Sequence, residues 1–384
     1  MTIERILITG GAGFIGSYTA LALLKRGKQV TILDNFTKQI HGDNWEESPT
    51  YVKLRGSDVC IVKGDVRDPD KWDEALAGQD AVIHLAAETG TGQSMYEITR
   101  YCDTNIQGTA IMLDKLVNTR HGVRRMIIAS SRSVYGEGKY HCAEHGVVYP
   151  EARRQDDMKR GDFAVKCPIC GSDAEPLATD EDSSIKPSSL YAVSKYTQEQ
   201  MMFVVGKAIR LPTVALRYQN VYGPGQSLSN PYTGILSIFS GVLLSGSQIN
   251  IFEDGLESRD FVFIEDVVEA NTLALEAEGA AFKTINVGTG ITTTVLAVAQ
   301  ELMKAYGVAG KLSISGQFRL GDIRHNFADI TRLKTCLRYV PKVGFTQGIG
   351  KFAAWVKAQG DKALAVQQRY QSSLSKMREK KLIF

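Results

Sequence analysis

The chain has 384 residues, of which 43% are hydrophobic, so it can bury a core large enough for two domains or for one large domain with a lobe. Its 45 basic and 42 acidic residues leave a formal net charge of +3, and no long basic stripe precedes the C-terminal tail, so we expect no nucleic-acid partner. No apolar stretch reaches membrane-spanning length and the start lacks a signal peptide, so we expect no membrane partner and a cytoplasmic location.

The N-terminal segment predicts a strand, a tight turn and a helix that together bind a dinucleotide. An apolar run over 6–8 leads into the glycine-rich segment 9–16, and an apolar-rich stretch follows over 20–24. Gly10 and Gly13 let the backbone turn sharply and approach a pyrophosphate, and Gly16 lets the helix pack closely on the strand. The helix N-terminus adds amide donors and a positive dipole. On this motif alone, a doubly wound fold without a nucleotide remains an alternative.

A second strand, over 29–33, ends at Asp34. A carboxylate at this point can accept hydrogen bonds from the adenosine ribose hydroxyls and would repel a 2′-phosphate, so the sequence predicts NAD rather than NADP. Lys38 is the one opposing charge nearby, and we expect it to be solvated.

Strands and helices alternate along the chain, which predicts a parallel sheet covered on both faces. We expect strands over 59–62, 81–85, 125–129 and 213–217, one long helix over 95–117, and a helix that carries Tyr191. The predicted fold class is α/β, a Rossmann-type doubly wound sheet with a smaller mixed α/β substrate lobe. The expected divisions are 1–220 for the NAD-binding domain, 221–355 for most of the lobe, and 356–384 for a polar, basic helix or tail. Cys60, Cys102 and Cys336 are expected to be buried small hydrophobic residues.

Three residues carry the predicted chemistry: Ser131, Tyr191 and Lys195. Tyrosine and lysine four positions apart on a helix point the same way, so the ammonium can lie near the phenol and lower its pKa. Such a phenol suits the deprotonation of a sugar hydroxyl, and Ser131, at the end of a strand, can bond the same hydroxyl. A Tyr-x3-Lys pair by itself is equally typical of an ordinary amphipathic helix.

An insert over 138–178 separates Ser131 from Tyr191 and contains two pairs of metal-ligand residues. Cys142 and His145 form one pair, and Cys167 and Cys170 the other, each with a two-residue gap typical of structural zinc sites. His141 is an alternative to His145. Three thiolates and one imidazole close the tetrahedron, so we expect structural zinc rather than catalytic zinc. The alternatives are free thiols in a disordered loop or an oxidised pair.

These residues resemble the extended short-chain dehydrogenase/reductase superfamily, and within it the nucleotide-sugar epimerases and dehydratases. The match runs from residue 3 to about 355, except for the insert. It implies a nucleotide-sugar substrate and a homodimer formed through the helices that carry Asn105 and Tyr191. The implied substrate residues are Ser131, Asn220, Arg259 and Arg324, with the two arginines on the diphosphate. The implied cofactor residues are Gly10, Gly13, Phe14, Ile15, Gly16, Asp34, Asn35, Asp65, Val66, Leu85, Ala86, Ala87, Asn105, Tyr191, Lys195 and Tyr218.

The reaction type follows from two positions after the catalytic serine. Dehydratases of this family carry an Asp-Glu pair there, whereas this chain has Arg132 and Ser133, which cannot supply that acid and base. We therefore predict 4-epimerisation through a 4-keto intermediate. The insert, together with segments 90–96 and 225–234, is similar to bacterial dTDP-L-rhamnose 4-epimerases. The alternatives are a UDP-hexose 4-epimerase, a 4-ketosugar reductase and a dinucleotide-binding sensor without catalytic activity.

Overall fold

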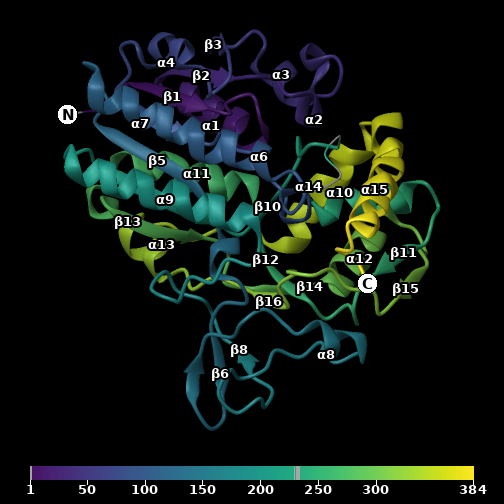
Figure 1. Cartoon of the computed structure of the whole chain (residues 1–384). Coiled ribbons are helices and arrows are strands. Elements are labelled where there is room, and N and C mark those ends of the chain that lie inside the picture. Colours follow the sequence, from purple (N-terminus) through teal and green to yellow (C-terminus); the bar gives the residue numbers. More distant parts are fainter. Residues whose placement is uncertain (1, 229, 231–233) are drawn as a thin grey trace.

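The computed structural model describes residues 2–228, 230 and 234–384. Ser229 and residues 231–233, part of the segment 225–234 used for the resemblance above, lie outside the described residues. The centre of the molecule is a seven-stranded parallel sheet of order β13-β9-β5-β4-β1-β2-β3 (Figure 1). Its strands are β1 (Arg5–Thr9), β2 (Gln29–Asp34), β3 (Cys60–Lys63), β4 (Ala81–His84), β5 (Arg125–Ser131), β9 (Thr213–Tyr218) and β13 (Lys283–Val287).

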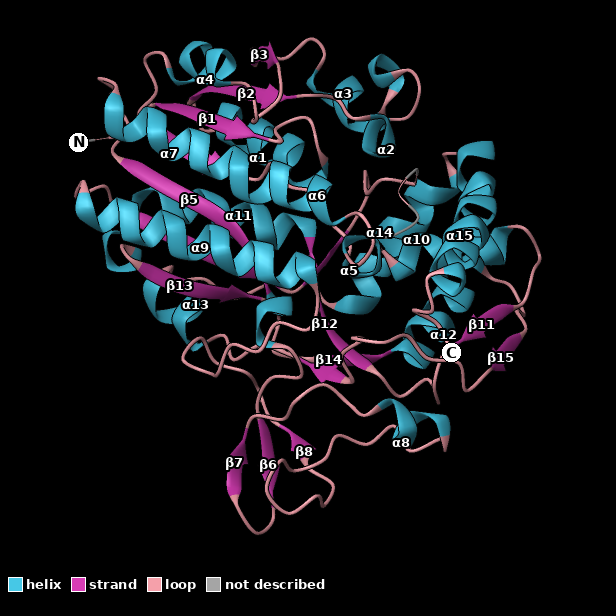
Figure 2. Cartoon of the chain, viewed as in Figure 1, coloured by secondary structure: helices cyan, strands magenta, loops and turns pink. Residues whose placement is uncertain are grey.

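Helices cover both faces of this sheet, as the alternation of elements predicts (Figure 2). Successive residues of β1 point to opposite faces, so Ile6 and Ile8 join one core cluster and Leu7 joins another. The first cluster is completed by α1 (Phe14–Lys25) and α11 (Ile264–Glu276), and the second by α4 (Pro69–Leu76), α7 (Gly108–Asn118) and α9 (Leu190–Ala208). The predicted Rossmann-type α/β fold is confirmed.

Two local predictions need correction. The expected helix over 95–117 is present but runs over 98–118, and a π-helical segment η2 (Cys102–Gln107) interrupts it between α6 (Ile98–Tyr101) and α7. The wider π turn re-aims side chains, and such turns are frequent at functional sites. The three cysteines expected to be buried are not: Cys60 is exposed, and Cys102 and Cys336 are half buried. Cys60 is exposed because it lies on the edge strand β3.

The smaller lobe has its own core of apolar residues. Its strands are β10 (Asn220–Tyr222), β11 (Ile249–Ile251), β12 (Ser258–Phe263), β14 (Thr292–Thr294), β15 (Leu312–Ile314) and β16 (His325–Asn326), and its helices are α10 (Ile235–Leu244), α12 (Val295–Tyr306) and α14 (Phe345–Lys357). The C-terminal segment is the helix α15 (Asp361–Glu379), whose Val366 packs on Gly241 of α10. Beyond it, the backbone of Phe384 exchanges two hydrogen bonds with Phe318.

The insert forms a separate projection below the sheet (Figure 1). It holds a three-stranded antiparallel sheet of order β7-β6-β8 and a short helix. Its elements are β6 (Tyr140–Cys142), β7 (Gly146–Val148), α8 (Gln155–Lys159) and β8 (Glu175–Pro176). The remaining short elements of the chain are α2 (Lys38–His41), η1 (Trp45–Glu47), α3 (Pro49–Leu54), α5 (Thr91–Ser94), η3 (Arg132–Tyr135), η4 (Glu278–Ala280) and α13 (Thr331–Cys336). None of the helices in the described part of the chain combines the length and apolar character needed to cross a membrane.

Candidate active site

The glycine-rich turn between β1 and α1 forms a cradle that fits a dinucleotide. Gly10 has φ +66°, and a Cβ there would lie 2.9 Å from the backbone nitrogen of Ala86. A Cβ on Gly16 would lie 2.3 Å from the carbonyl oxygen of Gly10. A Cβ on Gly13 would meet only that same carbonyl oxygen among the described residues, so this side of the turn is open to a ligand. The predicted residues Phe14 and Ile15 begin α1 at this point.

Asp34 ends β2 beside this cradle, and its carboxylate is buried and oriented by backbone amides. The amides of Ala12 and Phe36 each donate to it at 2.9 Å. Burial raises the pKa of Asp34, against the effect of His41, whose Nε2 lies 3.8 Å away. Each carboxylate oxygen still has acceptor capacity for a ribose hydroxyl. Lys38 is exposed and pairs with Asp43, so it does not offset the charge of Asp34.

Asp65 and Asn35, predicted to lie near the adenine, are in direct contact: the amide of Asn35 donates to Asp65 at 2.8 Å. Arg67 also donates to Asp65 from Nε and Nη2, at 2.8 Å each. This pairing with Arg67 lowers the pKa of Asp65 to about 2. Val66 follows with its carbonyl bound to the indole of Trp72.

The residues that follow β4 are held by side chains from two other elements. The backbone amide of Ala86, between Leu85 and Ala87, donates to the hydroxyl of Thr9 at 3.2 Å. Asn105, on the π-helical segment η2, accepts from the amide of Glu88 at 2.7 Å and donates to the hydroxyl of Ser194 at 2.9 Å. Asn105 thus joins this loop to α9, the helix of the catalytic tyrosine.

Ser131 and Tyr191 are brought together although sixty positions separate them in the chain. Ser131 ends β5, and Tyr191 lies in the first turn of α9, which Ser189 caps by accepting from the amide of Ala192. Burial raises the pKa of Tyr191, while a hydrogen bond with Ser131 and the charge of Arg132 act to lower it. The hydroxyl of Ser133 also bonds that of Ser131, at 2.9 Å. The hydroxyls of Ser131 and Ser133 thus lie beside the phenol of Tyr191.

The ammonium of Lys195 bonds a group other than Tyr191. It donates to the side chain of Gln198 at 2.7 Å, and the groups that lower the pKa of Tyr191 are Ser131 and Arg132. The expected role of Lys195 beside the phenol stays a prediction. Burial lowers the pKa of Lys195 to about 7. Gln198 in turn donates to Thr109 at 2.7 Å, and Thr109 bonds His84 at 3.1 Å. This buried chain of polar side chains was missed by sequence reasoning, because its members are spread over three elements.

Tyr218 ends β9 and is paired with Ser131 in the neighbouring strand, and Asn220 begins β10 two residues later. The hydroxyl of Tyr218 is buried and donates to Asn271 at 2.5 Å. The carbonyl oxygen of the Asn220 side chain accepts from Nε of Arg132 at 2.7 Å. From the sequence, Arg132 was noted only because it occupies a position where dehydratases carry an acidic residue. Its contact with Asn220 shows that it belongs to the site.

The two arginines predicted to bind the diphosphate are engaged with protein groups. Arg324 donates to both oxygens of Asp254 at 2.7 Å and to Glu253 at 3.0 Å. Arg259 donates from Nη1 to the carbonyl oxygens of Ser258, at 2.8 Å, and Arg324, at 3.1 Å. Their assignment to the substrate remains a prediction, and the geometry disfavours it for Arg324.

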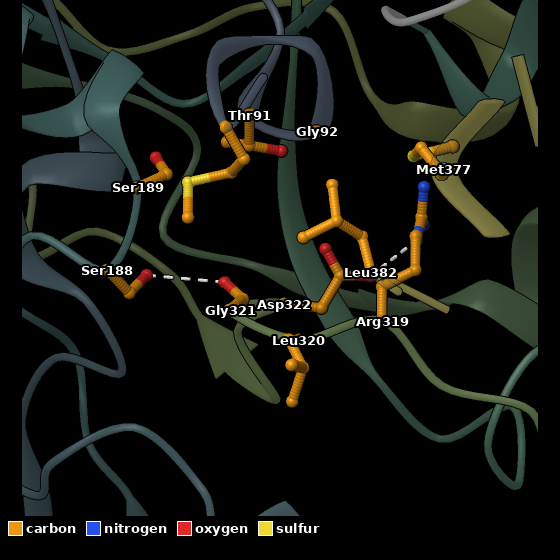
Figure 3. A pocket seen from close by; sticks show the side chains of 11 residues that line it. Thr91, Gly92, Ser188, Ser189, Arg319, Leu320, Gly321, Asp322, Met377 and Leu382 are labelled. Carbon is orange, nitrogen blue, oxygen red and sulfur yellow. Dashed lines mark hydrogen bonds and ion pairs between the residues drawn. The ribbon is translucent and has the colours of Figure 1, made fainter. Parts of the chain in front are cut away.

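A pocket beside the start of α9 contains another arginine, Arg319, which sequence reasoning missed (Figure 3). Its Nε donates to Asp322 at 2.9 Å, and Ser188 donates to the carbonyl of Gly321 at 3.2 Å. The pocket is lined by segment 91–95 on one side, by Ser188 and Ser189, by residues 319–322, and by Met377 and Leu382 of the C-terminal segment. The sequence offered one indication of Arg319: it lies five residues before Arg324, which was predicted to bind substrate.

In the insert, the four predicted metal ligands converge. Their ligand atoms all lie within 4.8 Å of one another. Sγ of Cys142 is 3.6 Å from Nδ1 of His145 and 3.6 Å from Sγ of Cys170, and Sγ of Cys167 is 3.8 Å from the same imidazole nitrogen. His141 is outside this group. Three sulfurs and one nitrogen at this spacing fit a tetrahedral metal ion.

Comparison with known proteins places this geometry in a family. The family model described as NAD dependent epimerase/dehydratase matches residues 6–288. A dTDP-L-rhamnose 4-epimerase of Burkholderia thailandensis is 35% identical, over 94% of this chain and 96% of its own, which confirms the resemblance stated above. A UDP-N-acetyl-alpha-D-glucosaminuronate decarboxylase of Bacillus cytotoxicus is 30% identical, over 92% of this chain and 98% of its own.

Solved structures agree with the family model. The structure of UDP-glucuronic acid 4-epimerase from Bacillus cereus, in complex with UDP-glucuronic acid and NAD, superposes with a TM-score of 0.76 at 26% identity, over 93% of this chain and 100% of that one. A glycine cradle, a strand-end carboxylate and a serine–tyrosine pair therefore occur here in a chain that belongs to the NAD-dependent epimerase/dehydratase family.

Proposed function

We propose that the protein is an NAD-dependent nucleotide-sugar 4-epimerase whose substrate is dTDP-L-rhamnose. The observation that carries the reaction type is that Ser131, at the end of β5, lies close enough to Tyr191 to lower the pKa of its phenol, on the same edge of the sheet as the glycine cradle. The similarity to 4-epimerases over almost the whole chain supports it. The choice of sugar is supported by the Burkholderia thailandensis relative alone.

Bound NAD, held by the glycine cradle and Asp34, supplies the hydride acceptor and donor for C4 of the sugar. Tyr191 takes the proton of the C4 hydroxyl, and Ser131 bonds the same hydroxyl and relays the proton. The sugar becomes a 4-keto intermediate, turns in the pocket, and regains a hydrogen on its other face as Tyr191 returns the proton. The cycle leaves the cofactor unchanged overall.

The residues disfavour the neighbouring reactions. Arg132 and Ser133 stand where a dehydratase needs an acid and a base, so removal of water from C5 and C6 lacks its groups. A 4-ketosugar reductase or a UDP-hexose 4-epimerase would use the same Ser131 and Tyr191 and remains the second candidate. A non-catalytic sensor has no need of the oriented pair.

The test is incubation of the NAD-loaded protein with dTDP-L-rhamnose, UDP-glucose and UDP-glucuronic acid, each read by NMR of the ring protons. We expect inversion at C4 of dTDP-L-rhamnose, with a C4 deuterium label retained in the product. Loss of the label to water would contradict a hydride mechanism. Inversion of only the UDP-sugars would move the assignment to the second candidate.

We infer that the insert binds one zinc ion through Cys142, His145, Cys167 and Cys170. The convergence of the four ligand atoms supports this, and so does the small size of the cluster of buried residues in the insert. That cluster contains only Tyr140, Val148 and Val165 besides two of the thiols. So few apolar side chains cannot hold a fold by themselves, so the metal would stabilise it. Thiolate ligands also suit a reducing compartment, which supports the cytoplasm as the location.

We also propose a homodimer through α7 and α9. The two helices lie side by side on the same face of the sheet (Figure 1). Val117 at the end of α7 is 50% exposed, and Val193 and Val204 on α9 are 40% and 67% exposed. Association would cover these exposed apolar side chains, which supports a choice of this face as the interface.

A further inference from the structure

The guanidinium of Arg132 lies next to the catalytic pair, and one of its donors has no partner. Nε is satisfied by Asn220 at 2.7 Å, but Nη1 is covered by protein and bonds nothing among the described residues. The side chain as a whole is only half buried, so its other edge can be reached from outside. A buried donor without a partner costs free energy, and a native protein keeps one where a ligand completes it.

The charge of Arg132 has no carboxylate in direct contact. In the part of the chain that the structure describes, no carboxylate lies within 4 Å of this guanidinium, whereas Arg153, Arg217 and Arg324 each have a carboxylate partner. Burial and the charge of Arg259 lower the pKa of Arg132 to about 9, although Asp322, Tyr191 and Asp260 act in the opposite direction from farther away. A guanidinium without a direct carboxylate partner, close to a second arginine, favours the binding of an anion.

We propose that Arg132 is a specificity-determining residue that binds an anionic oxygen of the nucleotide-sugar substrate. The inference rests on the proposed function, because it takes the ligand to be a nucleotide sugar whose C4 lies at Tyr191. Such a ligand offers two kinds of anionic oxygen: the diphosphate, present in all of them, and a carboxylate at C6, present in uronic acids. The planar guanidinium can form bidentate hydrogen bonds with a diphosphate or with a carboxylate.

A role in ligand binding and a role in structure predict opposite effects on stability. Removal of an arginine that stabilises the fold lowers the unfolding temperature. Removal of a desolvated charge without a direct partner leaves the stability of the ligand-free protein unchanged or raises it. Arg132→Met is therefore expected to keep or raise the unfolding temperature of the ligand-free protein. The matched control is Arg125→Met at the opposite end of β5, where the guanidinium donates to the carbonyls of Ala274 and Ala277. We expect this variant to lose stability and to keep its ligand affinity.

The experiment is calorimetric titration of the NAD-loaded protein with dTDP, UDP-glucose and UDP-glucuronic acid, for the wild type, Arg132→Met, Arg132→Lys and the control. We expect Arg132→Met to weaken binding roughly ten- to hundredfold, the range of one charged hydrogen bond, and Arg132→Lys to recover part of it. An equal loss for all three ligands assigns Arg132 to the diphosphate. A loss for UDP-glucuronic acid alone assigns it to the C6 carboxylate.

Unchanged affinity for all three ligands in Arg132→Met overturns the proposal, and so does a variant that fails to fold. The titration needs no turnover. A wild type that binds these ligands through Arg132 but inverts none of the sugars would overturn the epimerase assignment and leave the role of Arg132 standing.

Discussion

At the scale of single residues, the proposed proton-transferring groups Ser131 and Tyr191 are both half buried. Desolvation raises the pKa of Tyr191, and the neighbouring Ser131 and Arg132 oppose that effect. The phenol must lose its own proton before it can take that of the sugar hydroxyl, so the proposed role of Tyr191 as a base depends on the neighbours that lower its pKa.

Replacement of Tyr191 by Phe removes the proton acceptor and leaves the packing of the ring in place. We expect turnover to fall by about a hundredfold or more, because general base catalysis contributes that much, with NAD still bound. Single-turnover kinetics and the absorbance of the purified protein measure the two effects. Full activity in this variant would remove Tyr191 from the mechanism.

Lys195 provides a pH test. Burial lowers its pKa to about 7, whereas the unfolded chain holds the ordinary value of 10.5. Between these two values the unfolded state binds more protons, so the free energy of unfolding rises with pH. Relative to Lys195→Met, the wild type should gain up to about 1.4 kcal/mol per pH unit from pH 7 to 9, as measured by urea unfolding without cofactor. Parallel curves would show that the lysine is not desolvated.

At the scale of elements, the insert is joined to the substrate lobe by a buried network of charges. Arg153, from the insert, donates to both oxygens of Glu253 at 2.7 and 2.8 Å and to Glu137 at 3.2 Å. Arg324 completes it from the lobe, by its contact with Glu253 and by donating its backbone amide to Glu137 at 2.8 Å. Arg153 also donates to the carbonyl oxygen of Asp322 at 2.9 Å, so the insert holds a residue that lines the pocket beside the start of α9.

Arg153→Met leaves Glu253 and Glu137 buried with less compensation. We expect a loss of about 3–5 kcal/mol in unfolding free energy, the cost of breaking a buried ion pair. Arg160→Met is the control, because Arg160 is exposed and bonds only Asp157, one turn away on the same insert. That variant should change stability by less than about 0.5 kcal/mol. Equal losses of unfolding free energy in the two variants would mean that the buried network does not stabilise the fold.

Removal of the proposed zinc ligands tests the same element. The purified protein should contain close to one zinc per chain by elemental analysis, and Cys167→Ser combined with Cys170→Ser should lose it. Because the insert has so small a core, we expect faster proteolysis within 138–178 and reduced turnover. Cys60→Ser, on the exposed edge strand β3, is the control and should keep the metal. A metal-free wild type with full activity would end the zinc assignment.

At the scale of the whole molecule, the sequence predicted what depends on local pattern. The strands of the sheet and the glycine turn follow from periodicity and turn chemistry, and the four metal ligands from spacing. The π-helical segment at Asn105 could not be predicted, because one extra residue in a turn leaves no periodic signal. The partner of Arg324 could not be predicted either, since Asp254 lies in a segment far away in the chain. Gln198 is only three residues from Lys195, but which of the two neighbours, Gln198 or Tyr191, the ammonium bonds is decided by burial and not by spacing.

The proposed dimer is a property of the whole molecule that a charge on one helix face can test. Val193 and Val204 lie eleven residues apart, three helical turns, on one face of α9. A glutamate at both positions would have to be buried without a partner in the interface, so Val193→Glu with Val204→Glu should yield a monomer. Light scattering after gel filtration should give twice the mass of one chain for the wild type and a single mass for the double variant. Val147→Glu, 50% exposed on the insert, is the control and should remain a dimer. A double variant that stays dimeric would place the interface elsewhere.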